Sequence, residues 1–154
     1  MEFSEWLHQQ YQPYFSSYLM KGWKNDRHYF KSIELKPGQI TAVMDILDSY
    51  YPPETYYFST VHAIPLLYQL VILYACWDNQ LAQKPGDVYL RHLNIETPRM
   101  IQEMQDISFE LKLTQKRSLK AWWFYTMDFS IGGVKIPQAF FGALKYVVPR
   151  PDSV

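Results

Sequence analysis

The chain has 154 residues, with 15 basic and 15 acidic side chains and therefore no formal net charge at pH 7. This length suits one domain with a substantial core, so we expect a single domain over residues 1–154. The charge balance argues against a nucleic-acid-binding protein, which needs a basic surface to displace counterions from phosphates. Only 19% of the residues are charged and 18% are aromatic, and we therefore expect part of the surface to be covered in a homo-oligomer.

The single cysteine, Cys76, excludes a disulfide within the chain and indicates a reducing compartment. The first residues lack the basic start and apolar core of a signal peptide. The apolar run around residues 64–77 is shorter than the ~20 residues that span a membrane. We therefore expect a cytoplasmic protein without a membrane span.

The N-terminal half predicts a helical extension over residues 1–22, broken at Pro13, and then a β-hairpin. The hairpin strands, residues 29–36 and 39–47, alternate in hydropathy around the turn signal Pro37-Gly38. Residues 48–55 predict a loop, and residues 56–60 a short extended segment.

A long helix follows over residues 65–83. Pro65 suits the first helical position because its missing N–H is not needed there, and Pro85-Gly86 ends the pattern. Between Leu66 and Trp77 only Gln69 is plainly polar. A helix that is apolar all round must be buried on all sides.

The second half predicts strands. Alternation is clearest from Ile107 to Thr114, where every second residue is apolar. The predicted strands cover residues 88–95, 101–114, 121–131 and 134–146, with a charged turn at 115–120 and a frayed tail at 149–154. A doubly wound sheet needs helices between its strands, and this half has none. We therefore predict an α+β chain with a single hot-dog fold, a curved antiparallel sheet wrapped around a long buried central helix, which points to acyl thioester chemistry.

The candidate site lies where the chain enters this helix. Amide groups of a first helical turn have no partner within the helix and carry partial positive charge, so those near residues 63–67, including Ala63 and Leu66, are candidates for binding a thioester carbonyl oxygen. His62 is then placed to act as a general base or to orient water, with Ser59 and Thr60 beside the reacting carbon. The structural alternative is that His62 and Thr60 only cap the helix.

Further candidates are phenols, acids and an amide. Tyr14 and Tyr56 can donate hydrogen bonds to a carbonyl or water at neutral pH, although most of the 13 tyrosines serve packing. No acid lies between Leu66 and Trp77; the alternatives are Asp45, Glu54 and Asp78.

Gln69 binds either a substrate carbonyl or a neighbouring strand. Cys76 is expected to be an inert packing residue. The four histidines are too scattered to indicate a metal site, and we expect no cofactor.

The segment from Tyr56 to His62, with Gln12-Pro13-Tyr14 upstream, resembles the motifs of the FcoT-type long-chain fatty acyl-CoA thioesterases. The resemblance implies a hot-dog hydrolase of acyl thioesters carried on coenzyme A or acyl carrier protein, with site tyrosines at Tyr14 and Tyr56. That family also has asparagines where this chain has Ile64 and Leu73, and a glycine where it has Val61.

Three functions remain open from the sequence. The first is hydrolysis of acyl thioesters, with the acyl chain in a slot beside the central helix. The second is dehydration of 3-hydroxyacyl thioesters, for which a helix carboxylate is missing. The third is a non-catalytic hot-dog module that binds acyl chains or mediates assembly.

Overall fold

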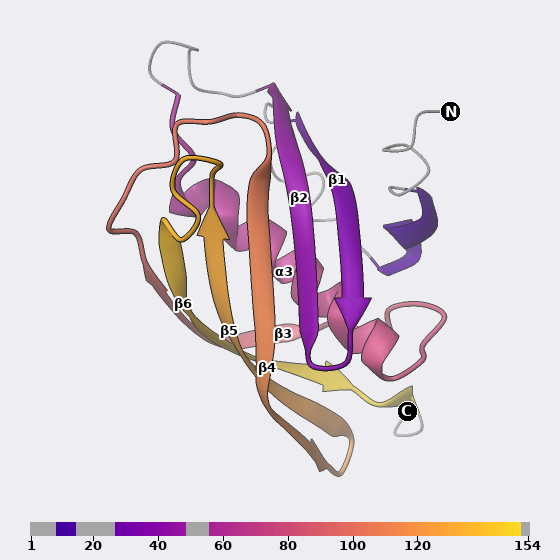
Figure 1. Ribbon diagram of the computed structural model, residues 1–154. Helices are drawn as coiled ribbons and strands as arrows, with labels where there is room; N and C mark the ends of the chain where they lie inside the picture. Colours follow the sequence, from indigo (N-terminus) through magenta and orange to yellow (C-terminus); the bar gives the residue numbers. More distant parts are fainter. Residues whose placement is uncertain (1–8, 15–26, 49–55, 152–154) are drawn as a thin grey trace.

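The computed structural model describes residues 9–14, 27–48 and 56–151 (Figure 1). One antiparallel sheet of six strands, in the order β1-β2-β4-β5-β6-β3, curves around the helix α3. The predicted α+β architecture, a curved sheet around a long buried helix, is thereby confirmed. The elements are η1 (Gln12–Tyr14), β1 (Arg27–Lys36), β2 (Gln39–Asp48), α3 (Thr60–Asp78), β3 (Tyr89–Glu96), β4 (Ile107–Leu119), β5 (Trp122–Gly132) and β6 (Phe140–Pro149).

Helix α3 forms the centre of the core. Every residue from Leu70 to Cys76 is at most 1% exposed, as an all-round apolar helix requires. The helix is long and apolar enough to cross a membrane, but 67% of its most apolar stretch is buried inside the fold. It is therefore a core helix.

The bounds of α3 differ from the prediction at both ends. The helix begins at Thr60, with Ser59 as N-cap, and ends at Asp78, with Asn79 as C-cap. Pro65 is thus the sixth helical residue, inside the helix, and its missing N–H leaves the carbonyl of Val61 without the usual donor. The prediction took the only proline of the segment as a start signal, whereas the chain uses a capping residue six positions earlier.

Tyrosine hydroxyl groups join α3 to the sheet. Tyr68 donates to the carbonyl of Val88 and accepts from the N–H of Leu90, which fixes the first residues of β3. Tyr74 accepts from the N–H of Gly38 in the β1–β2 turn. Part of the high tyrosine content therefore connects the buried helix to exposed parts of the sheet.

Strands β4 and β5 form a long hairpin that extends beyond the end of β2 (Figure 1). Residues 115–119, predicted as a charged turn, continue β4, and the turn itself is at Lys120 and Ala121. An irregularity between Leu113 and Gln115 inserts one extra residue opposite β5. Before it the odd-numbered residues of β4 face the helix; after it Lys116, opposite the buried Tyr125, does so.

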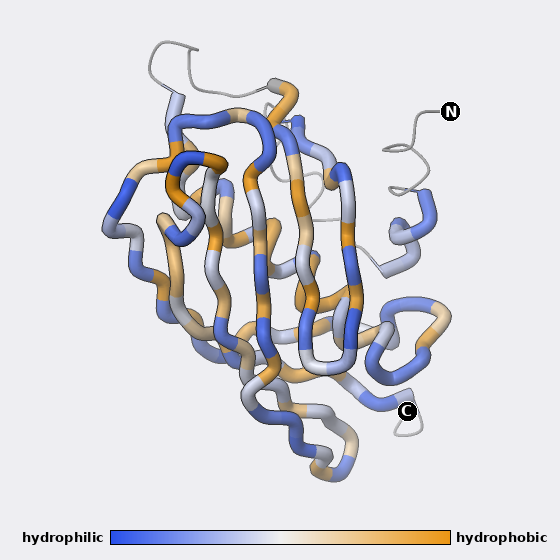
Figure 2. Tube along the Cα trace, viewed as in Figure 1, coloured by the Kyte–Doolittle hydropathy of each residue, from blue (hydrophilic) through white to orange (hydrophobic). Residues whose placement is uncertain are grey.

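The last strand also differs from the prediction. β6 starts at Phe140 rather than Val134, and residues 133–139 form the connection from β5. β6 continues to Pro149, and the N–H of Arg150 donates to the carbonyl of Ala121. The chain is therefore hydrogen-bonded to the β4–β5 turn as far as Arg150. Along the strands hydrophobic and hydrophilic residues alternate, and the tip of the β4–β5 hairpin is mostly hydrophilic (Figure 2).

Candidate functional site at the start of the central helix

His62 and Ser59 form a closed hydrogen-bonded unit at the start of α3. Ser59 has an extended backbone with φ −115° and ψ 174°, and its N–H donates to Nδ1 of His62 at 3.0 Å. The Oγ atom of Ser59 also lies 3.0 Å from Nδ1. His62 thus takes the place of the glutamate or glutamine that usually closes a capping box.

This arrangement fixes the tautomer of His62. A backbone N–H can only donate, so Nδ1 must accept, and the proton of a neutral imidazole is then on Nε2. His62 is therefore presented as a hydrogen-bond donor through Nε2. The expected role of general base does not fit this tautomer, whereas orientation of water or of a carbonyl oxygen does.

The surroundings of His62 are aromatic and buried. His62 is 7% exposed and stacks on Phe58, with ring centroids 5.5 Å apart and an interplanar angle of 22°. The ring of Tyr56, 6% exposed, lies 6.1 Å from the imidazole. Phe58 is held in turn by backbone pairing with Ile101. Burial makes each remaining polar interaction here stronger than it would be in water.

The amide groups with no acceptor inside the helix lie earlier than predicted. The N–H groups of His62 and Ala63 donate to the carbonyl of Ser59, at 3.1 and 3.0 Å. Helix geometry then leaves Thr60 and Val61 at the open end of the helix. Ala63 and Leu66 are therefore not amide donors for an oxyanion; they are buried parts of the helix body, 0% and 2% exposed.

Gln69 lies on the same face of α3 as His62, seven residues further on. That separation is two helical turns, roughly 10 Å along the axis. Gln69 is 3% exposed, so its amide is a buried polar group within the helix body. The structure therefore places a polar side chain at each end of a mostly apolar helical face, with Leu66 between them.

Tyr14 is not brought to this site within the chain. It lies in η1, which is next to the far end of α3 (Figure 1), where the N–H of Lys84 donates to the carbonyl of Pro13 at 3.4 Å. The ring of Tyr14 is 6.5 Å from that of Tyr11. Of the two tyrosines predicted for the site, the structure places only Tyr56 beside His62.

The acidic candidates are engaged elsewhere. The buried carboxylate of Asp45 accepts from the N–H of Asp106 at 2.9 Å and lies 3.7 Å from Nζ of Lys31, so it fixes the chain just before β4. Asp78 lies at the opposite end of α3, and Glu54 lies outside the described residues.

A second polar cluster, which sequence reasoning missed, closes the C-terminal end of α3. Asp78 accepts from the hydroxyl of Tyr125 at 2.8 Å and pairs with Lys116 at 2.6 Å. Asn79 donates to the Tyr125 hydroxyl at 2.6 Å and accepts from Lys116 at 2.9 Å. We call these four residues the C-terminal clamp. Its members come from the last residue of α3, its C-cap, β4 and β5, so no local sequence signal could have identified it.

The clamp tyrosine is held in its neutral form. Burial, and then the hydrogen bond to Asp78, raise the pKa of Tyr125 far above its ordinary value. The ring of Tyr146 stacks on Tyr125 at 5.0 Å, and complete burial likewise raises its pKa. Both phenols therefore act as neutral packing and hydrogen-bonding groups.

Cys76 is a buried core residue. Its thiol is buried in the middle of the core, and burial raises its pKa to about 12. Thiolate is the nucleophilic form and is scarce at neutral pH under these conditions, which agrees with the predicted packing role. Among the residues that the structure describes, no group of three or more histidine, cysteine or acidic side chains is placed to hold a metal ion.

Comparison with known proteins finds similar folds among solved structures. No family model and no curated protein sequence matches the chain. Among solved structures, the chain is similar to a dehydratase heterocomplex, ApeI:P, from Xenorhabdus doucetiae, with a TM-score of 0.64 and 11% identity over 94% of this chain and 93% of that one. It is also similar to a mutant thioesterase from Pseudomonas aeruginosa, with a TM-score of 0.57 and 13% identity over 97% and 96% of the two chains.

A third similar structure is a hypothetical thioesterase with coenzyme A from Streptococcus pneumoniae, with a TM-score of 0.57 and 8% identity over 79% of this chain and 88% of that one. At these identities the likeness is one of fold. Together with the sheet and the buried helix it defines the class: this is an α+β protein of the hot-dog fold.

Proposed function

We propose that this protein hydrolyses acyl thioesters carried on coenzyme A or acyl carrier protein, at the start of α3. The observation that carries the proposal is the hydrogen bond from the Ser59 N–H to Nδ1 of His62. It presents Nε2–H as a donor in a buried site next to the positive end of a helix. A developing oxyanion is the group that such donors stabilise best.

The steps of the reaction follow from these groups. The thioester carbonyl oxygen accepts from the N–H groups of Thr60 and Val61 or from Nε2–H of His62. Water, held near the Tyr56 hydroxyl, attacks the carbonyl carbon. The C–S bond then breaks, a proton of the water passes to the leaving sulfur, and a carboxylic acid and a thiol are released. The acyl chain lies along the apolar helical face that includes Leu66 and leads to Gln69. The resemblance of the Tyr56–His62 segment to FcoT-type thioesterases supports the same substrates.

Dehydration of a 3-hydroxyacyl thioester is the alternative reaction. The similarity of the fold to a dehydratase heterocomplex is the reason to consider this reaction. That reaction removes a proton from carbon and therefore needs a base. The tautomer of His62, with its proton on Nε2, disfavours it.

We also propose that the protein is a homo-oligomer in the cytoplasm. The edges of the sheet, β1 and β3, each have one side that pairs with no other described strand, and open edges invite pairing with another chain. Val61 and Ile64 are 44% and 36% exposed at the start of α3. A second copy that covers this face would also shield the site from bulk solvent.

Two assays of the full chain test the proposal. Thiol release from acyl-coenzyme A and acyl carrier protein substrates of several chain lengths measures hydrolysis. The ultraviolet absorbance of enoyl products from 3-hydroxyacyl substrates measures dehydration. We expect thiol release only. Enoyl formation without thiol release would favour the dehydratase, and neither product, with tight binding of a non-hydrolysable acyl thioester, would favour a binding module.

A further inference from the structure

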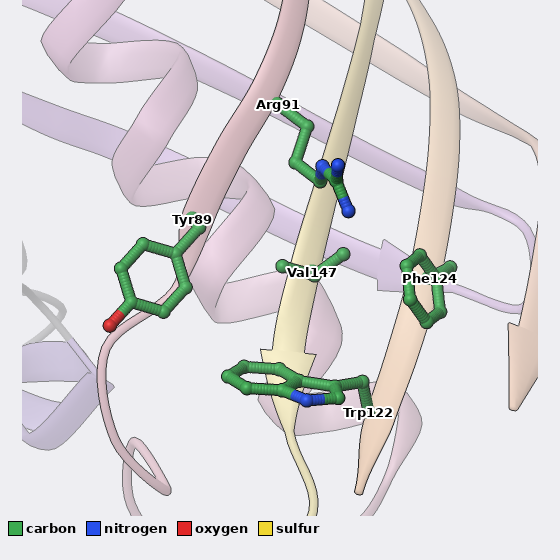
Figure 3. A pocket seen from close by; sticks show the side chains of 5 residues that line it. All are labelled: Tyr89, Arg91, Trp122, Phe124 and Val147. Atoms are coloured by element: carbon green, nitrogen blue, oxygen red, sulfur yellow. The ribbon is translucent and has the colours of Figure 1, made fainter. Parts of the chain in front are cut away.

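A cleft of about 270 Å³ lies on the outer face of the sheet, away from α3 (Figure 3). We call it the aromatic cleft. In β5 and β6, Tyr125 and Tyr146 face the helix, so their neighbours in sequence face outward. The lining residues are Tyr89, Arg91, Trp122, Phe124 and Val147.

Strand register builds the cleft. Tyr89 of β3 lies opposite Val147 of β6, Val147 lies opposite Phe124 of β5, and Phe124 lies opposite Arg117 of β4. Residues that are directly opposite in neighbouring strands have Cβ atoms about 5 Å apart on one face. Arg117 therefore borders the cleft although it does not line it. One row across four strands thus combines a tyrosine, an aliphatic floor, a phenylalanine and an arginine.

The aromatic rings form walls around that floor. Figure 3 shows Val147 in the middle, Tyr89 and Phe124 on either side, Trp122 below and Arg91 above. The rings of Tyr89 and Trp122 are 6.0 Å apart at 60° and contact each other, so the open space lies over Val147. Tyr89 is 52% exposed, an unusual position for a large ring that serves only packing.

The charge around the cleft is positive. Arg91 and Arg117 have no carboxylate within ion-pair distance among the described residues, and neither does Lys145 on the same face. In this chain of zero net charge, residues 112–120 carry four cations and no acid. Two guanidinium groups that lack a carboxylate are suited to a multiply charged anion such as phosphate.

We infer that the aromatic cleft binds a mononucleotide. The base lies over Val147 against the rings of Trp122 and Phe124, and the phosphate at the rim pairs with Arg91. Arg117, on the opposite side of the cleft, adds to the positive charge around it. The volume is just under the ~300 Å³ at which pockets for small molecules begin, enough for a base with the phosphate outside. Free nucleotides and the nucleotide end of coenzyme A share this chemistry. The inference does not depend on the proposed hydrolysis, because His62 lies on the other side of the sheet.

Calorimetric titration of the full chain with AMP, adenosine and inorganic phosphate tests this inference. We expect AMP to bind with Kd below about 1 mM, a binding free energy of about −4 kcal/mol or better, and adenosine and phosphate each to bind at least tenfold more weakly. Both parts of the ligand are then required. No heat from AMP at several millimolar would overturn the inference.

Variants locate the binding. Arg91→Met should weaken AMP at least tenfold, whereas the matched control Arg99→Met, an exposed arginine outside the cleft, should leave it unchanged. Trp122→Leu should also abolish binding, with circular dichroism and thermal melting as the check on folding. Equal effects of Arg91→Met and Arg99→Met would contradict the location.

Competition identifies the source of the nucleotide. If coenzyme A displaces AMP, its nucleotide end occupies the cleft; if it does not, the ligand is a free nucleotide. An oligonucleotide of ten thymidines should bind no more tightly than AMP, because strands need several successive stacking platforms. Tight binding of the oligonucleotide without binding of AMP would assign the surface to nucleic acid and overturn the inference.

Discussion

The two ends of α3 use polar groups in opposite ways. They lie roughly 27 Å apart, at 1.5 Å per residue. At the C-terminal end, a carboxylate, an amide, a phenol and an ammonium group bind one another. At the N-terminal end, one histidine side chain closes the cap, and the amide groups of Thr60 and Val61 point out of the helix.

The C-terminal end of the helix therefore has a structural role, and the N-terminal end is the proposed site of the reaction. In the C-terminal clamp each polar group binds another member of the clamp, so it stabilises the helix against β4 and β5 and has little capacity for a substrate. At the N-terminal end the first amide groups of the helix have no acceptor inside it, and such donors suit the oxyanion of the proposed reaction. Substitutions at the first end should therefore change stability, and those at the second end activity.

The largest effect is expected at His62. The change His62→Gln keeps a residue that can close a capping box but removes the imidazole donor. We expect kcat/KM for thioester hydrolysis to fall about 100-fold, or about 2.7 kcal/mol. The melting temperature should change by only a few degrees.

The matched control is His92→Gln, an exposed histidine on β3, which should hydrolyse at the wild-type rate. Wild-type activity of His62→Gln would remove His62 from the mechanism.

The next effect is expected at the other end of the helix. Asp78→Ala leaves the Tyr125 hydroxyl and Lys116 without their carboxylate. Because both Asp78 and Lys116 are partly exposed, most of the loss comes from the hydrogen bond of Tyr125. We expect about 2 kcal/mol less stability in urea unfolding, with unchanged kcat/KM for the folded protein.

Asp78→Asn serves as the comparison, since it keeps an acceptor and should cost about half as much. If Asp78→Ala lowered activity at constant stability, the division between the two ends would be wrong.

Alkaline pH should weaken the clamp end. Burial raises the pKa values of Tyr74, Tyr125 and Tyr146 above the ordinary value of 10.0. The stabilisation that depends on their neutral form is complete below pH 10. It is lost as the pH rises above 10, because the unfolded chain then releases protons that the folded chain retains. We expect stability to fall above pH 10, with a contribution from Tyr125 of up to about 1.4 kcal/mol per pH unit.

Urea unfolding between pH 8 and pH 11 measures this loss, and Tyr125→Phe should make it less steep. An identical slope in the variant would show that Tyr125 ionises equally in both states.

The smallest effect is expected at Lys116. Its ammonium group pairs with Asp78 and lies 5.4 Å from the ring centre of Tyr125, but it is 30% exposed. We expect Lys116→Met to cost about 0.5 kcal/mol, close to the effect of Lys112→Met in an exposed pair with Glu110. A loss above about 1.5 kcal/mol would show that the ion pair, rather than the phenol, holds the clamp.

Periodicity in the sequence was sufficient for the fold. The all-apolar stretch from Leu66 to Trp77 and the alternation from Ile107 to Thr114 predicted the buried helix and the sheet, since both depend on local spacing. The start of the helix was misplaced because Pro65 resembles a first helical residue. The better signal, Ser59 followed three residues later by His62, is a capping box with an uncommon closing residue.

The candidate site residues lie together only where they are local in the sequence. Tyr56 and His62 lie within one short segment and are together in the structure, whereas Tyr14 is at the other end of α3. The clamp depends on pairing of Asp78 with Lys116 and Tyr125, which are 38 and 47 residues away along the chain. Such contacts arise from strand register, which the sequence does not display.

The irregularity between Leu113 and Gln115 determines which face of the sheet the later residues of β4 occupy. One additional residue, Thr114, exchanges the sides on which odd and even positions lie. Lys116 reaches Asp78 and Arg117 reaches the aromatic cleft only because of this exchange. Removal of Thr114 would leave all later pairs unchanged, whereas one more residue beyond it would send each of the two cations to the opposite face. The hairpin therefore tolerates removal of Thr114, whereas an insertion after it would separate Lys116 from Asp78 and Arg117 from the aromatic cleft.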